Sequence, residues 1–288
     1  MAGAESTRLA ATRRGVVVGG LAVALAGSAR ANPPGLSFAG HFVQCGTVIG
    51  RTAPRAQILV DGVEMEPASA DGLFVVGFDR DAPDTADIVA RTPGGVAEHL
   101  AQVAKGVYDV QRINGLPNDQ VEPSDPALLA RIAREIQRKN VGFASRADTD
   151  DFKSGFALPL KTFRLSARFG GQRILDGVPK RPHYGTDLAA PIGTPVLAPA
   201  PGRIAFAETG LHFEGSLIMI DHGQGLLSMY LHLSRVDVSA GQTVQRGQLI
   251  GLVGMEGRAT GPHLCWRMSW RGRHLDPMLL VGVSAPVA

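Results

Sequence analysis

The chain has 288 residues, enough to bury a large core and to form two domains. Its 44% hydrophobic and 19% charged residues are ordinary for a globular protein, and 36 glycines and 19 prolines favour turns and short strands over long helices. Residues 1–31 carry four Arg and one Glu, and taking these from the 29 basic and 26 acidic side chains leaves 25 of each. The remaining chain is therefore neutral overall, and its charge gives no reason to expect nucleic acid or an anionic membrane as a partner.

The first segment in chain order is a predicted signal peptide over residues 1–31. Arginines precede a short apolar run at 15–26, and Ala29-Arg30-Ala31 follows as a small-x-small cleavage pattern. The run is too short to span a bilayer as a mature helix, so we expect no stable membrane span after cleavage; an uncleaved anchor is the alternative. Arg13-Arg14 resembles a twin-arginine signal, with general secretion as the other route. We therefore expect an exported protein of the periplasm or cell envelope.

Short apolar or β-branched runs then predict a small antiparallel β domain over residues 32–122. The expected strands are 42–43, 47–49, 57–60 and 73–78. Asp61-Gly62 and Asp71-Gly72 are typical turn dipeptides between these strands. No pattern in this domain indicates chemistry, and the charged cluster 79–84 is expected to be a solvated loop.

A helix and a linker are predicted over residues 123–153. Asp125 is a suitable N-cap, and Pro126 suits the first helical position. The apolar face of this helix is expected to consist of Leu128, Leu129, Ile132 and Ile136. The polar stretch 145–151 that follows is interpreted as a hinge or linker.

Residues 154–283 return to a β pattern punctuated by Gly and Pro. Strands are expected at 195–198, 202–206, 216–220, 227–231 and 248–251. Six of the eight histidines lie in this region, namely His183, His212, His222, His232, His263 and His274. This concentration indicates that the chemistry lies in the C-terminal domain.

Three separated segments of this domain contribute His, Asp or Cys. His183 and Asp187 are four residues apart in a sequence unsuited to a helix, so a turn or bent strand has to bring their side chains together. His263 and Cys265 are at positions i and i+2, which places them on the same face of a strand. His232 lies on an apolar strand segment between these two pairs. His, Asp and Cys are the ligand set on which a single Zn²⁺ site draws.

The span 164–277 resembles the LytM/lysostaphin-type family of zinc endopeptidases, which cut peptide cross-links in bacterial peptidoglycan. The matching stretches are His183-Tyr184-Gly185-Thr186-Asp187, Pro191-Ile192-Gly193-Thr194-Pro195-Val196, Asp221-His222-Gly223, Tyr230-Leu231-His232-Leu233, Gly241-Gln242-Thr243-Val244, Arg246-Gly247-Gln248-Leu249-Ile250-Gly251 and Thr260-Gly261-Pro262-His263-Leu264. The preceding region is similar to the β domain and helix found before such catalytic domains in some exported Gram-negative members. The resemblance therefore implies a mainly β fold, with an antiparallel β-sheet catalytic domain at 154–283 after a small β domain and a connecting helix.

Carried over residue by residue, the resemblance makes His183 and Asp187 ligands of one Zn²⁺ per chain. It makes His232 and His263 the catalytic residues beside the metal. The third ligand falls on Cys265, where the family usually has His; a thiolate is also a good Zn²⁺ ligand. The implied function is an exported zinc metalloendopeptidase that hydrolyses peptidoglycan stem peptides with metal-activated water. The bond cut and any partner proteins stay open.

Two alternatives also stay open on the sequence. A LytM-like domain without hydrolytic activity would instead regulate other cell-wall hydrolases. A disulfide between Cys45 and Cys265 would remove the third ligand and switch the site off; without it, Cys45 is expected to be a small buried residue. Among the other histidines, His222 is expected in a turn, and His212 and His274 on the surface or the groove rim.

Overall fold

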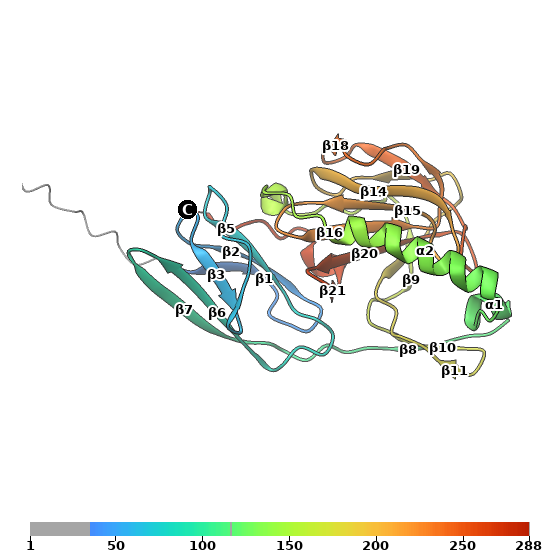
Figure 1. The fold of residues 1–288 in the computed structure, drawn as a ribbon, viewed down its shortest axis with the longest axis horizontal. Helices are drawn as coiled ribbons and strands as arrows, with labels where there is room; N and C mark the ends of the chain where they lie inside the picture. Colours follow the sequence, from blue (N-terminus) through green and yellow to red (C-terminus); the bar gives the residue numbers. More distant parts are fainter. Residues whose placement is uncertain (1–34, 116, 288) are drawn as a thin grey trace, which may run out of the picture. The chain divides into compact units, whose positions relative to one another are not determined.

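The computed structural model describes residues 35–115 and 117–287, so the predicted signal peptide lies outside the described residues (Figure 1). Strands dominate, and among the strand pairs of the described ranges only β8 (Val110–Ile113) with β10 (Gln172–Leu175) is parallel. The mainly β fold with antiparallel sheets confirms the expected fold class. Within the part of the chain that the structure describes, no helix is long and apolar enough to cross a membrane.

Two small sheets form the N-terminal region. One joins β1, β2 and β5, and the other joins β4, β3, β6 and β7 in that order. Their bounds are β1 Ser37–Gly40, β2 Thr47–Arg51, β3 Gln57–Val60, β4 Val63–Glu64, β5 Leu73–Gly77, β6 Thr85–Thr92 and β7 Gly95–Gln102. The prediction of a strand at 42–43 is wrong, because Val43 forms only an isolated bridge with Ala104. The hairpin of β6 and β7 was not predicted, since its polar and small residues hide a strand pattern.

The helical segment consists of α1 (Asn118–Val121) and α2 (Pro126–Phe143). The predicted helix start is confirmed, because the Asp125 carboxylate accepts hydrogen bonds from the N–H groups of Ala127 and Leu128. The predicted apolar face is wrong for Leu129 and Ile136, which are each 45% exposed. Leu128 and Ile132 are half-buried, and the buried residues of the helix are Glu135, Lys139 and Gly142.

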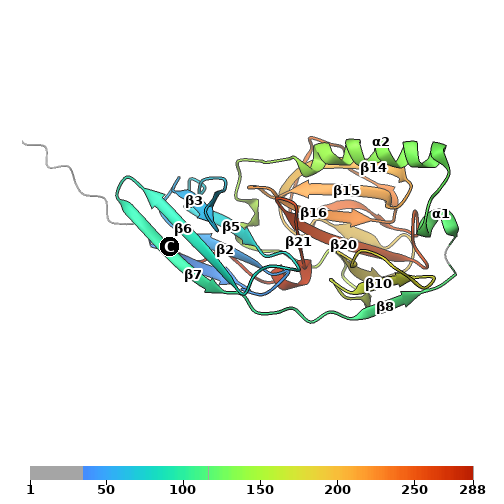
Figure 2. The ribbon, with the colours of Figure 1, turned by 60° about the horizontal axis from the view of Figure 1, so that its bottom comes forward.

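Helix α2 packs alongside β14 (Gly202–Leu211; Figure 2). Two of its charged side chains, Glu135 and Lys139, are buried there because each has a partner. The Glu135 carboxylate accepts from Arg131 Nε at 2.8 Å and from the His212 N–H at 2.9 Å. Lys139 Nζ donates to Glu214 Oε1 at 2.5 Å. A buried charge is tolerated when it is paired in this way. The same packing buries His212, so its predicted surface position is also wrong.

The C-terminal region is built around an eight-stranded sheet with the order β18-β14-β15-β16-β20-β12-β9 and β21 beside β20. Separate three-stranded sheets have the orders β13-β19-β17 and β11-β10-β8. The further bounds are β9 Arg164–Ala167, β11 Val178–Pro179, β12 Thr186–Ala189, β13 Pro195–Leu197, β15 Gly215–Asp221, β16 Leu226–Leu231, β17 Leu233–Val236, β18 Thr243–Val244, β19 Leu249–Val253, β20 His263–Trp270 and β21 Arg273–Leu275, with 3₁₀ turns η1 Asp151–Ser154 and η2 Pro277–Leu280. The five strands expected here are thus all present.

Nearly all side chains of the two central strands, β16 and β20, are buried. Since successive side chains of a strand point to opposite faces, both faces of these strands are covered. On one face, Tyr230 of β16 and Trp266 of β20 belong to the same apolar cluster. On the other face, Leu231 of β16 and Cys265 of β20 belong to a second cluster. The predicted third ligand therefore lies against a hydrophobic wall rather than at the surface.

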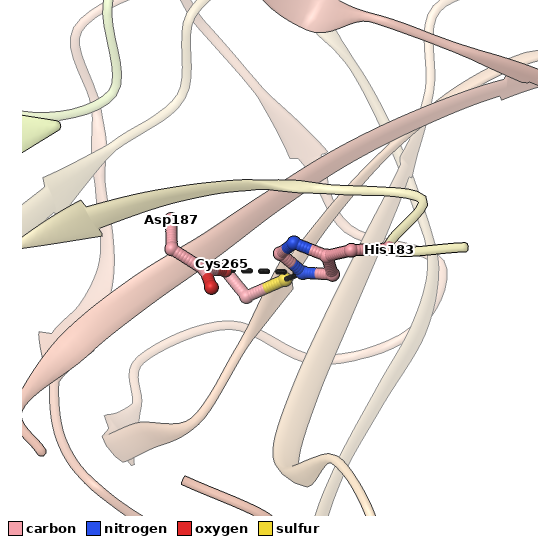
Figure 3. Close-up of side chains that lie close together, drawn as sticks. All are labelled: His183, Asp187 and Cys265. Atoms are coloured by element: carbon pink, nitrogen blue, oxygen red, sulfur yellow. Dashed lines mark hydrogen bonds and ion pairs between the residues drawn. The ribbon is translucent and has the colours of Figure 1, made fainter. Parts of the chain in front are cut away.

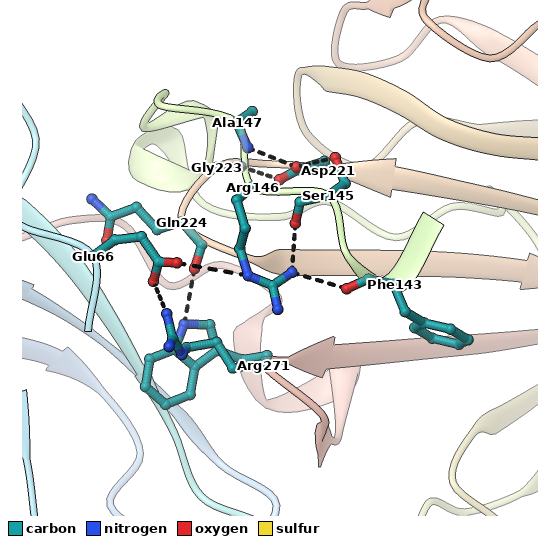
Figure 4. Close-up of polar contacts among 10 residues, drawn as sticks. Glu66, Phe143, Ser145, Arg146, Ala147, Asp221, Gly223, Gln224 and Arg271 are labelled. Atoms are coloured by element: carbon teal, nitrogen blue, oxygen red, sulfur yellow. Dashed lines mark hydrogen bonds and ion pairs between the residues drawn. The ribbon is translucent and has the colours of Figure 1, made fainter. Parts of the chain in front are cut away.

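The predicted linker at 145–151 is fixed on both of its sides (Figure 4). Ser145 Oγ donates to Asp221 Oδ2 at 2.6 Å, which ties the segment to the end of β15. Arg146 forms an ion pair with Glu66 of the N-terminal region, with Nε and Oε1 3.6 Å apart. These contacts make the segment a bridge between the two regions.

One apolar cluster also joins the N-terminal region to the C-terminal one. Trp270 of β20 and Leu275 of β21 pack with Val76 of β5 and with Phe78. Gly77 allows this close approach, since a Cβ there would lie 2.8 Å from Leu275. The described residues accordingly belong to one compact unit, and the domain boundaries at 122 and 153 stay predictions.

Candidate metal centre

Strand register brings the predicted ligands together. Asp187 of β12 lies directly opposite Cys265 of β20, and His263 lies opposite Ala189 on the same pair of strands. Cys265 and His263, two residues apart, share a face of β20. His183 comes from the loop just before β12. The structure therefore joins the predicted segments at one point, as the sequence pattern required.

The three predicted ligands form a tight buried cluster (Figure 3). One atom of each, from His183, Asp187 and Cys265, lies within 4.8 Å of the other two. His183 Nε2 is 3.2 Å from Asp187 Oδ1 and 3.4 Å from Cys265 Sγ. Ligand atoms at the usual Zn–N, Zn–O and Zn–S distances, arranged tetrahedrally, would be roughly 3.3 to 3.6 Å apart. The observed distances fit one zinc ion shared by the three side chains.

An unsatisfied polar atom also fits a metal at this position. Asp187 Oδ1 is buried and has no hydrogen-bond partner. It lies 3.2 Å from His183 Nε2, the ring nitrogen that also faces the Cys265 sulfur. A buried carboxylate oxygen without a partner is costly, and a bound cation would remove that cost.

The two predicted catalytic histidines lie beside this cluster, with the ring centroids of His232 and His263 4.7 Å apart. Each Nδ1 is bonded to a backbone carbonyl: His232 Nδ1 to Glu256 O at 2.7 Å, and His263 Nδ1 to Gly261 O at 2.8 Å. A carbonyl only accepts, so Nδ1 carries the proton and Nε2 of each neutral ring has a free lone pair. His263 Nε2 is 3.7 Å from Asp187 Oδ1, so this lone pair lies at the cluster.

Backbone strain marks the position of His232. Its φ angle is +65°, in the left-handed region that residues other than glycine rarely adopt. The residue follows the end of β16, and its N–H donates to Glu214 O at 2.9 Å. Such strain persists when the surroundings hold it in place, and it is often found at functional sites.

Burial sets the proton affinity of these groups. Burial lowers the pKa of His232 to about 4, and it also lowers the pKa of His263, where the nearby Asp187 carboxylate partly opposes the shift. For Asp187, burial alone would raise the pKa. The neighbouring side chains of His183, His263 and Arg173 outweigh it and lower the pKa. Near neutral pH the cluster therefore presents a carboxylate beside two neutral imidazoles.

Three arginines around the cluster were not predicted from the sequence. Arg173 donates to Asp187 Oδ2 at 3.1 Å, and Arg267 Nε donates to Cys265 Sγ at 3.4 Å. Arg258 lines the same hollow as Asp187. Only Arg267 had a sequence signal, since it lies two residues beyond Cys265 and so on the same face of β20.

Two of the remaining histidines have other surroundings. His222 directly precedes a turn, as expected, but it is fully buried and bonded to Pro201 O and Ser228 Oγ. His274 is partly exposed and stacks on Tyr184, with ring centroids 3.9 Å apart, which confirms its place on a rim.

Both cysteines are free and buried, so the disulfide alternative is wrong for this structure. The thiol of Cys45 lies 3.2 Å from the hydroxyl of Tyr108, whereas the thiol of Cys265 faces His183 and Arg267. The prediction that Cys45 is a small buried residue is confirmed, at 2% exposure.

The fold and this cluster agree with the comparison to known families. Residues 181–277, which contain all five candidate site residues, match the profile of peptidase family M23. This part of the chain is a peptidase M23 domain, of the family also called LytM/lysostaphin.

Several known proteins are similar to the chain. Peptidoglycan DD-endopeptidase ShyA of Vibrio cholerae is 44% identical over 118 residues, which cover 40% of this chain and 27% of ShyA. DD-carboxypeptidase/endopeptidase Mpg of Neisseria meningitidis is 31% identical over 243 residues, 83% of this chain and 54% of Mpg. The chain thus spans little more than half, or less, of the length of these relatives. A crystal structure from Pseudomonas aeruginosa, assigned to peptidase M23, superposes with a TM-score of 0.63 at 29% identity, covering 83% of this chain and 95% of that one.

Proposed function

We propose that this protein is an exported zinc-dependent metalloendopeptidase that hydrolyses peptide cross-links of bacterial peptidoglycan. The observation that carries the proposal is the buried cluster of His183, Asp187 and Cys265 with two histidine Nε2 atoms beside it. The name of ShyA, a peptidoglycan DD-endopeptidase, supports the choice of substrate, and the name of Mpg, a DD-carboxypeptidase/endopeptidase, supports the reaction.

The residues of the cluster and the two histidines beside it have different roles in hydrolysis. His183 Nε2, Asp187 and the Cys265 sulfur would hold the ion, which when bound supplies Lewis acidity for the attacking water and the scissile carbonyl. Because their Nδ1 protons are fixed on Glu256 and Gly261, His232 and His263 can each accept a proton at Nε2. The ring that takes the proton of the attacking water becomes an N–H donor. It can then stabilise the developing oxyanion or protonate the leaving amine.

A regulatory domain without activity is the weaker proposal. Such a domain has no need to keep five residues of a metal site in one place, with the backbone strain at His232. The cluster would then have no catalytic role. The sequence change at Cys265 still leaves a metal-binding side chain in the cluster.

The proposal is tested by measuring zinc per chain in the purified protein, kept reduced and handled without chelators, and then digestion of purified sacculi. We expect about one zinc per chain. We also expect release of uncross-linked peptides that a chelator stops and added zinc restores. Protein that takes up no zinc after loading, or zinc-loaded protein that releases no peptide, would overturn the proposal in favour of the regulatory one.

Export is a proposal that rests on the sequence of residues 1–31 alone. Expression in a Gram-negative host, followed by N-terminal sequencing of the protein from the periplasmic fraction, tests it. A chain beginning at Asn32 is expected, and an uncleaved chain in the cytoplasmic fraction would contradict it.

A further inference from the structure

A cavity of about 360 Å³ lies beside the metal centre, and His183 is part of its wall. Apart from Tyr184, its other charged or titratable lining residues are all basic: Arg173, Lys180, Arg181, Arg258, Arg267 and His274. No Asp or Glu of the described ranges lines it. Arg173 and Arg258 also line the small hollow that holds Asp187, so the basic cavity continues into the site.

Two of these arginines lack a carboxylate partner. Arg258 donates through Nη1 to Gln120 O at 3.2 Å and lies over the ring of Phe213 at 4.8 Å. Arg267 donates only to the Cys265 sulfur. In the described part of the chain, neither has an Asp or Glu within ion-pair distance, whereas the neighbouring Arg173 is paired with Asp187.

Further basic groups of the cavity are only partly compensated. Arg173 is paired with Asp187 through one terminal nitrogen, but its Nε is buried without a hydrogen-bond partner. Lys180 is paired with Glu122, an exposed residue that is not part of the cavity wall. Burial lowers the pKa of Arg258, and the charges of Arg173 and Arg267 lower it further, so the guanidinium groups repel each other.

Metal binding makes this excess of positive charge larger. A divalent cation held by neutral His183, the Asp187 carboxylate and a Cys265 thiolate has a formal charge of zero. Asp187 and Cys265 are then neutralised by the ion and no longer balance Arg173 and Arg267. The loaded site therefore keeps several guanidinium charges in a partly buried cavity, where an uncompensated charge is unfavourable.

We propose that this cavity binds a carboxylate group of the peptide substrate, through Arg258 and Arg267, beside the bond that is cleaved. The inference rests on the proposed function for the identity of the substrate. A guanidinium offers a planar pair of N–H donors that matches a carboxylate, and such charge-assisted bonds are the strong ones. The carboxylate comes from a side chain next to the scissile bond or from the C-terminus of the peptide.

Paired synthetic peptides test the proposal. In the first pair, a peptide with an amidated C-terminus carries a side-chain carboxylate or its primary amide next to the scissile bond. In the second pair, the only difference is a free or amidated C-terminus. We expect a preference for the free acid of roughly 10- to 100-fold, in both kcat/KM and the dissociation constant from calorimetry. The pair that shows the preference identifies the source of the carboxylate.

Variants connect that preference with the cavity. Arg258→Gln is expected to reduce it to less than about threefold, and Arg258→Lys to leave an intermediate value because the paired donors are lost while the charge stays. Arg181→Gln, at an exposed cavity residue whose change leaves folding intact, is expected to weaken the preference about threefold. The matched control is Arg235→Gln, an exposed arginine paired with Asp237 that lines no part of the cavity, and it leaves the preference unchanged.

Equal cleavage and equal binding of acids and amides by the wild-type protein would overturn the proposal. A preference that survives in both Arg258→Gln and Arg181→Gln would overturn it as well. If no peptide is cleaved, the proposed function fails, and the calorimetric comparison of acid with amide still decides whether the cavity binds a carboxylate.

Discussion

The two faces of the sheet at β16 and β20 place their buried histidines in different surroundings. On one face, His222 Nδ1 donates to Pro201 O, its Nε2 accepts from Ser228, and Ser228 in turn accepts from the Tyr230 hydroxyl at 2.7 Å. On the other face, His183 Nε2 points at Asp187 Oδ1, which is buried without a hydrogen-bond partner. Both faces contain buried histidine, so the residue type does not distinguish them.

The difference teaches that hydrogen-bond satisfaction separates a structural histidine from a ligand. A closed chain of bonds such as that at His222 offers nothing to a ligand and contributes to stability. A buried carboxylate oxygen without a partner, as at Asp187, is unfavourable until something binds there. Removing groups from each face therefore ought to affect metal content on one side and folding stability on the other.

The largest effect is expected from Asp187→Asn on the site face. Losing the carboxylate should abolish zinc binding and lower peptide cleavage by at least about a thousandfold, or roughly 4 kcal/mol of transition-state stabilisation. Zinc per chain and the rate of sacculus digestion measure it. Asp237→Asn, at an exposed carboxylate paired with Arg235, is the matched control. Full zinc content in Asp187→Asn would mean that the orphaned oxygen is not a ligand.

On the opposite face, acid is expected to destabilise the fold through His222. Burial lowers its pKa from 6.5 to about 4. Between these values the unfolded chain binds more protons than the folded one, so its contribution is complete above pH 6.5 and is lost as the pH falls towards 4. The loss is about 3 kcal/mol. Urea unfolding of chelator-treated protein between pH 7.5 and 4.5 measures it.

The matched variant for this pH effect is His222→Gln, which cannot titrate. Its stability is lower at neutral pH, but it should fall less steeply with acid than that of the wild type. Parallel curves for the two proteins would show that other groups cause the acid sensitivity.

A smaller loss is expected from Ser228→Ala. The change leaves His222 Nε2 and the Tyr230 hydroxyl without their shared partner, which should lower the free energy of unfolding by roughly 1–3 kcal/mol. Zinc per chain should not change. Ser239→Ala, at an exposed serine, is the control for stability. A loss of zinc without a loss of stability would contradict the separation of the two faces.

The smallest effect concerns the packing beneath Cys265. A Cβ on Gly185 would lie 2.7 Å from Cys265 Sγ and 2.9 Å from Arg267 Cγ. Gly185→Ala should therefore displace the thiol and weaken zinc affinity about tenfold, or roughly 1.4 kcal/mol. Gly261→Ala, which has open space around its Cβ, is the control. Competition with a chromogenic chelator measures both, and equal affinities would place Cys265 outside the ligand set.

The sequence by itself determined the fold class, the start of α2 at Asp125 and Pro126, and the candidate residues of the metal centre. These depend on local chemistry: turn dipeptides, an N-cap, and ligand-type side chains at fixed spacings in a motif. The register of Asp187 opposite Cys265 then followed from strand pairing.

Only the tertiary structure decided the buried face of α2, the burial of His222 and the cavity formed by Arg173, Arg258 and Arg267. Glu135 and Lys139 are buried in place of Leu129 and Ile136 because His212 and Glu214, more than 70 residues away, supply their partners. No periodicity encodes such a partner. From the sequence alone, a charged side chain is expected to be exposed. Only the fold shows whether it is buried beside a counter-charge, as at Lys139, or lacks one, as at Arg258.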